Sequence, residues 1–398
     1  MRFPSDVVYL DHASMGIPTS ATLDAISRAL SQIARPEGTG TERTLEFIAA
    51  VERAREEAAR LVNVDRGCIA LVENTSRGLG LVASALPLKA GDNILVDDLE
   101  FLSAVLAWRG VSRRIGVEIR PVRTECGRVL PQDFERVADQ YTRALVLSSV
   151  QEVNGYRCDL RAFGELAESL KAFLIVDGIQ EAGIVPVDLA STTVHAYCAG
   201  GHKWLRSPLG LGFLYIHPAL LELLSPPAWG YLALIEPDRS WEAYLQSPRR
   251  TPFDNLPELP DARRFSSGMP NGLGATALAQ SISEIREDQL SGWGRVCEMR
   301  ACLIDDLLEL GLELRTPFGT ADDHPSGIIC FGSKAGFEAE RRLYETLLEN
   351  RLYVSLRYIS GIGGIRVGIH FSNTNDDVEA LGEIVRDHTR GSRAAVVV

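Results

Sequence analysis

Two residues in the middle of the chain have the types and the context that a covalent cofactor requires. Asp177 ends the apolar segment FLIVDGIQ, and Lys203 follows about 25 residues later in GGHKWL. A lysine can form an imine with an aldehyde and a carboxylate can keep a pyridine nitrogen protonated, so the pair fits the chemistry of pyridoxal 5'-phosphate (PLP). Either residue alone would be weak evidence, because an Asp at a strand end is usually a cap and a lone Lys is usually a solvated charge. Lys203, however, lies between glycines and Trp204, with His202 beside it, which is not typical of a solvated surface.

A second segment has the order of elements that binds phosphate. Residues 71–86, LVENTSRGLGLVASAL, read as a strand, a polar turn and a helix, which places Thr75 and Ser76 at a helix N-terminus. Taken alone, the segment is better explained as an ordinary helix cap. The segment therefore indicates a phosphate site only in combination with Asp177 and Lys203.

Short apolar runs alternate with helical stretches from about residue 20, which predicts an α/β fold with a mostly parallel sheet covered by helices. Ligands of such sheets bind at the carboxyl ends of the strands. A segment rich in proline and aromatic residues follows, and then a helical stretch from about 273 and a smaller α+β unit. The runs that we expect to be buried strands are 68–72, 93–97, 144–150, 173–177 and 211–216. The expected divisions are an N-terminal segment (1–20), a large domain (21–272), a small C-terminal domain (273–390) and a tail (391–398).

Composition excludes several classes of function. A formal net charge of -12 argues against a nucleic-acid-binding protein, which would present a basic face. No apolar run is long enough to span a membrane and no secretory signal precedes the first strand, so we expect a cytoplasmic protein. The seven cysteines are scattered and odd in number, which favours neither a disulfide framework nor a metal site.

The motifs, taken in order, resemble those of one known family. They are YLDHASMGIPTS, VENTSRGLGL, DDLEFLSAVLAW, LSSVQEVNGYRCDL, VDGIQEAGIVPVDL, GGHKWLRSPLGLGFLY, RFSSGMPNGLG and GIRVGIHFSNTNDDVEAL, from about residue 8 to residue 386. This series resembles the class V aminotransferase-fold enzymes, which include cysteine desulfurases, carbon–sulfur lyases, kynureninases and isopenicillin N epimerase-like proteins. The resemblance implies a PLP-dependent transferase fold of type I, and a homodimer whose active sites lie at the subunit boundary.

The resemblance also implies a role for each residue around the cofactor ring. Lys203 resembles the lysine that binds PLP covalently, and Asp177 resembles the partner of the pyridine N–H. Gln180 resembles the donor to the phenolic oxygen of the ring. Phe101 falls where the family stacks an aromatic side chain or a histidine on the ring, although plain core packing would also explain a phenylalanine there.

Two further groups of residues match positions at the ends of the site. Thr75, Ser76 and His202 match positions on the phosphate side. Arg366, in GIRVGIHF, matches the arginine that binds the α-carboxylate of the substrate, a task suited to its planar fork.

The chain departs from the family at several positions. Cysteine desulfurases carry a nucleophilic cysteine on the loop before the carboxylate-binding arginine, whereas this chain reads SLRYISGIGGIR, and Cys330 nearby lies in an apolar strand. Gly200 replaces a common hydroxyl residue, and Met269 replaces a threonine that reaches the phosphate of the neighbouring subunit. Glu152 stands where desulfurases have an asparagine, and it either addresses the substrate or is a solvent-facing loop acid.

These observations predict an enzyme that acts on a free α-amino acid or a larger molecule carrying that group. Without the persulfide cysteine, we expect a carbon–sulfur lyase that carries out β-elimination on a cysteine S-conjugate in specialised biosynthesis. Decarboxylation-coupled oxidative deamination, transamination and epimerisation remain alternatives. An alternative of another class is a catalytically silent binding homologue, against which intact Lys203, Asp177 and Arg366 argue.

Overall fold

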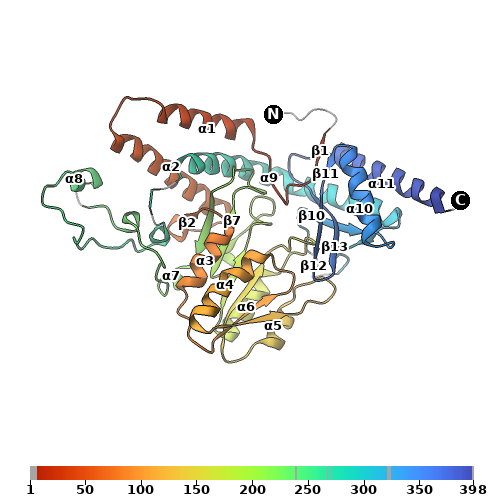
Figure 1. Ribbon diagram of the computed structural model, residues 1–398, viewed down its shortest axis with the longest axis horizontal. Helices are drawn as coiled ribbons and strands as arrows, with labels where there is room; N and C mark the ends of the chain where they lie inside the picture. The colour runs from red at the N-terminus through yellow and green to blue at the C-terminus, as the bar shows by residue number, and fades with distance from the viewer. Residues whose placement is uncertain (1–6, 238–239, 267, 270, 321–323, 397–398) are drawn as a thin grey trace.

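A seven-stranded sheet forms the centre of the larger part of the structure (Figure 1). The structure is a computed structural model that describes residues 7–237, 240–266, 268–269, 271–320 and 324–396. The strand order is β2-β8-β7-β6-β5-β3-β4, and β3 to β7 run parallel, whereas β8 is antiparallel to β7 and β2. This arrangement confirms the expected α/β fold with a mostly parallel sheet. The strands are β2 Ile69–Val72, β3 Asn93–Asp97, β4 Glu118–Val122, β5 Thr142–Ser148, β6 Phe173–Asp177, β7 Ala196–Gly200 and β8 Gly212–Ile216.

Two of these strands were not among the predicted runs. Strand β4 reads EIRPV and lies at the edge of the sheet, where four of its five residues are exposed or only partly buried and need not be apolar. Strand β7 reads AYCAG, and apart from Tyr197 its side chains are small and give little apolar signal, although all five residues are buried. Apolar runs therefore identified the large-residue strands and missed the edge strand and the small-residue strand.

Successive residues of the central strands supply two separate hydrophobic cores. Leu145, Leu147 and Leu174 lie in one core, while Val146 and Ile175 lie in the other. Since side chains alternate across a strand, this pattern places helices on both faces of the sheet. The first core continues into the C-terminal sheet, through Ile328 and Val367 among others.

Helices cover both faces and the top of the sheet. Helix α3 is capped by Asn74, whose side chain accepts from the backbone N–H of Arg77, and α4 ends at Gly116 in the left-handed conformation. Helix α9 is the longest, and Figure 1 shows it passing from beside α1 and α2 toward the C-terminal unit. The helices of this part are α1 Ser20–Ile33, α2 Gly40–Leu61, α3 Thr75–Ala85, α4 Leu102–Ile115, α5 Pro131–Val137, α6 Leu160–Leu170, α7 Pro218–Leu221, α8 Trp241–Leu245 and α9 Gly272–Glu309.

The C-terminal unit is built on a four-stranded antiparallel sheet in the order β12-β13-β10-β9. Helices α10 Phe337–Glu349 and α11 Asn375–Val396 accompany it. Its strands are β9 Glu313–Leu314, β10 Ile328–Gly332, β12 Ser355–Ile359 and β13 Ile362–Gly368. A tail was expected from residue 391, but α11 continues to Val396, and residues 397 and 398 lie outside the described residues. The exact division into domains remains a prediction.

The first described residues of the chain lie against this C-terminal unit. Strand β1 (Val8–Tyr9) pairs in parallel with β11 (Leu352–Tyr353), and the backbone N–H of Gly368 donates to the carbonyl of Leu10. The residues that follow β1 then pass over the carboxyl edge of the large sheet, where Gly16 donates its N–H to the carbonyl of His202. Within the described ranges, no helix is long and apolar enough to cross a membrane.

Candidate functional site

One cavity of about 350 Å³ at the carboxyl edge of the large sheet is lined by every site residue predicted from the sequence. Strands β5, β6 and β7 end at Ser148, Asp177 and Gly200, so the residues just after them meet at this edge. The C-terminal sheet contributes one wall through β13. The predicted residues that line the cavity are Thr75, Ser76, Phe101, Glu152, Asp177, Gln180, His202, Lys203 and Arg366.

Lys203 lies on the turn after β7, directly beneath the N-terminal segment. A Cβ atom added to Gly16 would lie 1.9 Å from the carbonyl oxygen of Lys203, so glycine is required there for the close approach of the two segments. Burial and the positive charge of Arg366 lower the pKa of Lys203 to about 8, against the opposing effects of Asp177 and Glu152. A useful fraction of the amine is therefore neutral near pH 7, as nucleophilic attack on an aldehyde requires.

Asp177 ends β6 and is 3% exposed. Its Oδ1 accepts a hydrogen bond of 3.0 Å from the backbone N–H of Ile179, and none of the described contacts engages Oδ2. Burial raises the pKa of Asp177 to about 6, while the hydrogen bond from Ile179 and the charge of Lys203 oppose this shift. The carboxylate is thus mostly ionised at neutral pH and has one oxygen ready to pair with a protonated ring nitrogen.

The N-terminus of α3 supplies the donors expected for a phosphate. The Oγ1 of Thr75 accepts from the backbone N–H of Gly200 at 2.9 Å, which leaves its hydroxyl hydrogen available. The Oγ of Ser76 lies 2.6 Å from the Oγ of Ser103, a further hydroxyl at the cavity wall. Burial and Lys203 lower the pKa of His202, so its ring is neutral and can donate one N–H.

Gly200 and Met269, the two departures from the family near the expected phosphate site, lie in different surroundings. Gly200 lies beside His202, since an added Cβ would be 3.2 Å from the His202 ring, and its backbone supports Thr75 instead of a side-chain hydroxyl. Met269 does not line this cavity; it is 60% exposed and lines a separate apolar hollow beside α2 and β2.

Phe101 precedes α4 at the mouth of the cavity. Its ring is 48% exposed, and the ring centroid lies 6.0 Å from the Nζ of Lys203. Plain core packing does not describe a ring that is half exposed in this way. An aromatic face beside the reactive amine is instead suited to stack on a planar ring.

Arg366 is buried and already paired with a carboxylate of its own chain. Its Nη1 donates to the side chain of Glu152 at 2.8 Å and to the backbone carbonyl of Glu152 at 3.0 Å. Its Nη2 donates to the Oγ of Ser14 at 2.6 Å, and Asp11 lies 3.6 Å away. Glu152 is therefore neither a solvent-facing acid nor independent of the predicted carboxylate site.

Sequence reasoning missed three contributors. Ser14 and Ser355 bind the guanidinium of Arg366, and the Oγ atoms of the two serines lie 2.9 Å apart. Arg357 lines the cavity, and its charge lowers the pKa values of both Lys203 and Arg366. The motifs YLDHAS and SLRYIS contain these residues, but nothing in their spacing indicates that the two segments meet at Arg366.

A buried pair of acids underlies the same edge of the sheet. Glu100 accepts from the Oγ of Ser148 at 2.9 Å and from Gln151 at 3.3 Å, and Gln151 also contacts Asp97 at 3.4 Å. Burial, followed for Glu100 by the negative charge of Asp97, raises the pKa values of both acids. At least one proton is therefore retained by this pair at neutral pH.

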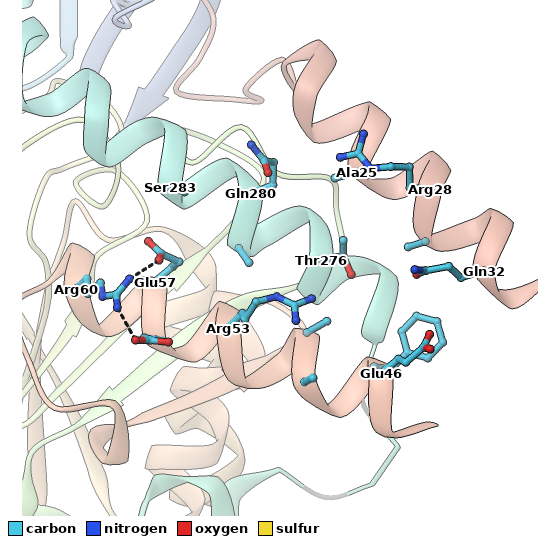
Figure 2. A pocket seen from close by; sticks show the side chains of 16 residues that line it. Ala25, Arg28, Gln32, Glu46, Arg53, Glu57, Arg60, Thr276, Gln280 and Ser283 are labelled. Atoms are coloured by element: carbon cyan, nitrogen blue, oxygen red, sulfur yellow. Dashed lines mark hydrogen bonds and ion pairs between the residues drawn. The ribbon is translucent and has the colours of Figure 1, made fainter. Parts of the chain in front are cut away.

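A larger cavity, of about 720 Å³, lies between α1, α2 and α9 (Figure 2). Figure 2 shows Arg53 projecting from α2 toward the space between the helices, and Arg60 bound to Glu57. No lysine lines this space among the described residues, and its acids are arranged along one helix. Its size therefore does not make it the reaction site.

The family comparison agrees with this geometry. Residues 8–251 match the model of the family described as Aminotransferase class-V. A probable cysteine desulfurase of Methanothermobacter thermautotrophicus is 26% identical over 96% of this chain and 94% of its own length. An isopenicillin N epimerase of Streptomyces clavuligerus is 33% identical over 47% of this chain and 48% of its own length.

Solved structures agree on the fold. The cystine C-S lyase C-DES, in complex with its reaction product cysteine persulfide, superposes with a TM-score of 0.83 at 19% identity, covering 96% of this chain and 98% of that chain. The chain belongs to the class V aminotransferase family, and it is a PLP-dependent enzyme with the fold of that family.

The residues present fit the cofactor on structural grounds. The cavity holds an amine with a lowered pKa, a buried carboxylate with an open oxygen, and hydroxyl groups at a helix N-terminus. These groups match an aldehyde, a pyridine nitrogen and a phosphate in turn. We assign the individual contacts as predictions, because family membership defines the cofactor but not each contact.

Proposed function

We propose that this enzyme is a carbon–sulfur lyase that releases a thiol from a cysteine S-conjugate by β-elimination, in a specialised biosynthetic pathway. The observation that carries the proposal is the turn before Arg366. Strands β12 and β13 are joined by Ser360 and Gly361 alone, both with positive φ, in place of a loop that could carry a sulfur nucleophile. None of the described residues that line the cavity is a cysteine.

The cysteine closest to this turn along the chain is unsuited to accept sulfur. Cys330 is buried in β10, and burial raises the pKa of its thiol to about 12. A thiol that cannot ionise is a poor nucleophile. The leaving sulfur would therefore depart into solution.

PLP, once bound to Lys203, supplies an electron sink that acidifies the Cα–H bond of the substrate. The Lys203 amine, once free, would be placed to take the Cα proton as a general base. Asp177 would pair with the ring nitrogen and keep it protonated. The Cβ–S bond breaks with its electron pair on sulfur, and water later converts the remaining three-carbon fragment into pyruvate and ammonia.

The carboxylate end of the substrate would be held by Arg366. Because Glu152 uses the Nη1 donors in this structure, an incoming α-carboxylate has to displace the Glu152 side chain. Arg357 is a second cation that lines the same cavity. This competition would give Glu152 a role in substrate selection.

The decisive experiment is a product assay of the PLP-loaded enzyme with cystine and a panel of cysteine S-conjugates. The lyase should give pyruvate, ammonia and a free thiol or persulfide in equal amounts. Alanine with sulfane sulfur on the protein would establish a desulfurase instead. Carbon dioxide, a required keto-acid acceptor or racemised substrate would establish the decarboxylating, transaminating or epimerising alternatives.

Cys126 provides a matched control for sulfur transfer. It is exposed, and the neighbouring carbonyl of Gly127 accepts from Asn154 at 2.7 Å, so it lies on a turn beside the segment that carries Glu152. It does not line the cavity. Cys126→Ser should leave turnover unchanged if sulfur leaves into solution, and loss of turnover would favour a protein-bound persulfide.

We also propose that the enzyme works as a cytoplasmic homodimer. Large apolar side chains are exposed next to cavity-lining segments: Leu102 is 67% exposed beside Phe101, and Leu209 is 64% exposed on the loop after Lys203. Burial of such side chains against a second copy would stabilise a dimer. A molar mass in solution of a single chain would contradict this proposal.

A further inference from the structure

The orientation of the Gln180 side-chain amide is fixed by two neighbours, one a hydrogen-bond donor and the other a hydrogen-bond acceptor. Its Oε1 accepts a hydrogen bond of 2.7 Å from the indole Nε1 of Trp204, and its Nε2 donates to the carbonyl of Ala13 at 3.1 Å. An indole N–H can donate but not accept, and a backbone carbonyl can accept but not donate. The amide therefore has one orientation that satisfies both partners, with its oxygen toward Trp204 and its nitrogen toward Ala13.

This orientation leaves one N–H of Gln180 for the cavity. The amide nitrogen carries two hydrogens, and Ala13 takes one of them. Among the described contacts the second hydrogen has no protein acceptor, and Gln180 is 2% exposed and lines the PLP cavity. If the amide were flipped, its oxygen would face the carbonyl of Ala13 and part of the cavity wall would change from a donor to an acceptor.

Trp204 is itself held firmly in place. Its side chain is fully buried, and its ring stacks on His370 with centroids 6.2 Å apart. Burial lowers the pKa of His370 to about 3, so the ring is neutral; Nδ1 accepts from the N–H of Ser372 at 3.3 Å, and Nε2 is left to donate to the carbonyl of Trp204 at 3.1 Å. A Cβ atom added to Gly327 would lie 2.7 Å from the Trp204 ring, which shows how closely the indole is packed.

We infer that Trp204 is a positioning residue: its indole N–H locks the Gln180 amide so that an N–H group, and not an oxygen, faces the bound cofactor. Trp204 acts through Gln180 and does not line the cavity itself. Lys203 and Trp204 are adjacent in the chain. The turn that carries the lysine expected to bind PLP therefore also carries the residue that orients the Gln180 amide. This role of Trp204 in the cofactor site does not depend on which bond of the substrate is broken.

The test compares Trp204→Phe, Gln180→Leu and the double variant as PLP-loaded enzymes. Phenylalanine keeps an aromatic ring but deletes the donor. A hydrogen-bond donor to the phenolic oxygen of PLP stabilises the anionic form of that oxygen. Without the donor the oxygen should be more basic, and the proton that it shares with the neighbouring nitrogen should be bound more tightly. The pH midpoint of the visible absorbance of bound PLP should rise by about one unit, and the Kd for PLP should rise about tenfold.

The double variant should show no larger change than the stronger single variant, because Gln180→Leu removes the donor and Trp204→Phe acts only through its orientation. Trp108→Phe is the matched control. Trp108 is also buried, but its indole nitrogen has no hydrogen-bond partner within the described structure and it does not line the cavity. This control should leave the pH midpoint and the Kd for PLP unchanged.

A second measurement needs no substitution at Trp204. The apoprotein contains five tryptophans, whose indole N–H signals can be resolved by ¹⁵N NMR and assigned with the Trp204→Phe and Trp108→Phe variants. Gln180→Leu should move the Trp204 signal and speed its exchange with solvent. An unmoved Trp204 signal, a pH midpoint in Trp204→Phe equal to that of the unmodified enzyme, or additive changes in the double variant would overturn the inference.

Discussion

The Nη1 of Arg366 lies 2.8 Å from the Oε2 of Glu152, so the group expected to receive the substrate carboxylate already holds a carboxylate of the same chain. The Arg366 side chain is 1% exposed and that of Glu152 is 14% exposed, which places the pair at the inner wall of the cavity. A substrate carboxylate must therefore compete with Glu152 for Arg366. The net binding free energy of the carboxylate is the difference between the free energies of two similar ion pairs.

Glu152→Gln should lower the KM for amino acids with a free α-carboxylate, by roughly tenfold. The amide still reaches Arg366 but carries no charge, so the substrate displaces it more easily. Steady-state kinetics on a single cysteine conjugate would measure this effect. An increase in KM would instead mean that Glu152 contacts the substrate directly.

Arg366→Ala should raise the KM for carboxylate substrates by about a hundredfold and affect decarboxylated amine analogues much less. Arg357→Ala is a matched variant, because Arg357 is a cation in the same cavity whose side chain donates to the carbonyl of Leu356. Its effect on KM should be smaller. Equal losses on both substrate types in Arg366→Ala would identify a structural arginine, and circular dichroism would show whether the fold survives.

Lys203→Ala should abolish covalent attachment of PLP and turnover while the fold remains intact, since one cavity amine is not part of the packed core. In the unmodified apoprotein, the rate of PLP attachment should increase with pH and level off above about 8, because the neutral amine is the nucleophile. Stopped-flow absorbance across the pH range would measure this rate. A rate independent of pH would contradict the assignment of Lys203.

Asp177→Asn should retain bound PLP but lose most of the turnover, because a neutral amide no longer stabilises a protonated ring nitrogen. The loss should appear in kcat more than in KM, since the contact matters most when negative charge develops at Cα. Unchanged kcat would show that Asp177 is not the partner of the ring.

The acid pair of Asp97 and Glu100 predicts how stability depends on pH. Burial raises the pKa values of both acids in the folded state. Their contribution to stability is therefore fully present below the unfolded value of about 4 and is lost as pH rises through the raised folded values. Asp97→Asn should flatten the fall in unfolding free energy between about pH 4, the unfolded value, and about pH 7, to which burial raises the pKa of Asp97, by up to about 1.4 kcal/mol per pH unit. Urea unfolding of the apoprotein at several pH values would test this, and an unchanged slope would refute it.

Sequence motifs predicted more of the residues that line the Lys203 end of the cavity than of those around Arg366. Asp177 ends β6 and Lys203 follows the neighbouring strand β7, so strand order alone brings them to one edge. The pairing of Glu152 with Arg366 joins residues 214 positions apart, and that of Ser14 with Arg366 joins residues 352 positions apart. Such contacts depend on how the C-terminal sheet packs on the large one, which local periodicity does not encode. The tight turn at Ser360 and Gly361 likewise depends on the register of β12 and β13, which the sequence pattern does not specify.

The N-terminal segment also has a consequence for biosynthesis of the enzyme. Residues 8–16 are synthesised before their partners in the C-terminal unit, which include β11, Ser355, Arg366 and Gly368. The contacts of Gly16 with His202 and of Ala13 with Gln180 therefore lack the support of the C-terminal unit until that unit has been synthesised. A nascent chain stalled before β13 should therefore bind PLP poorly even though its large sheet is already complete.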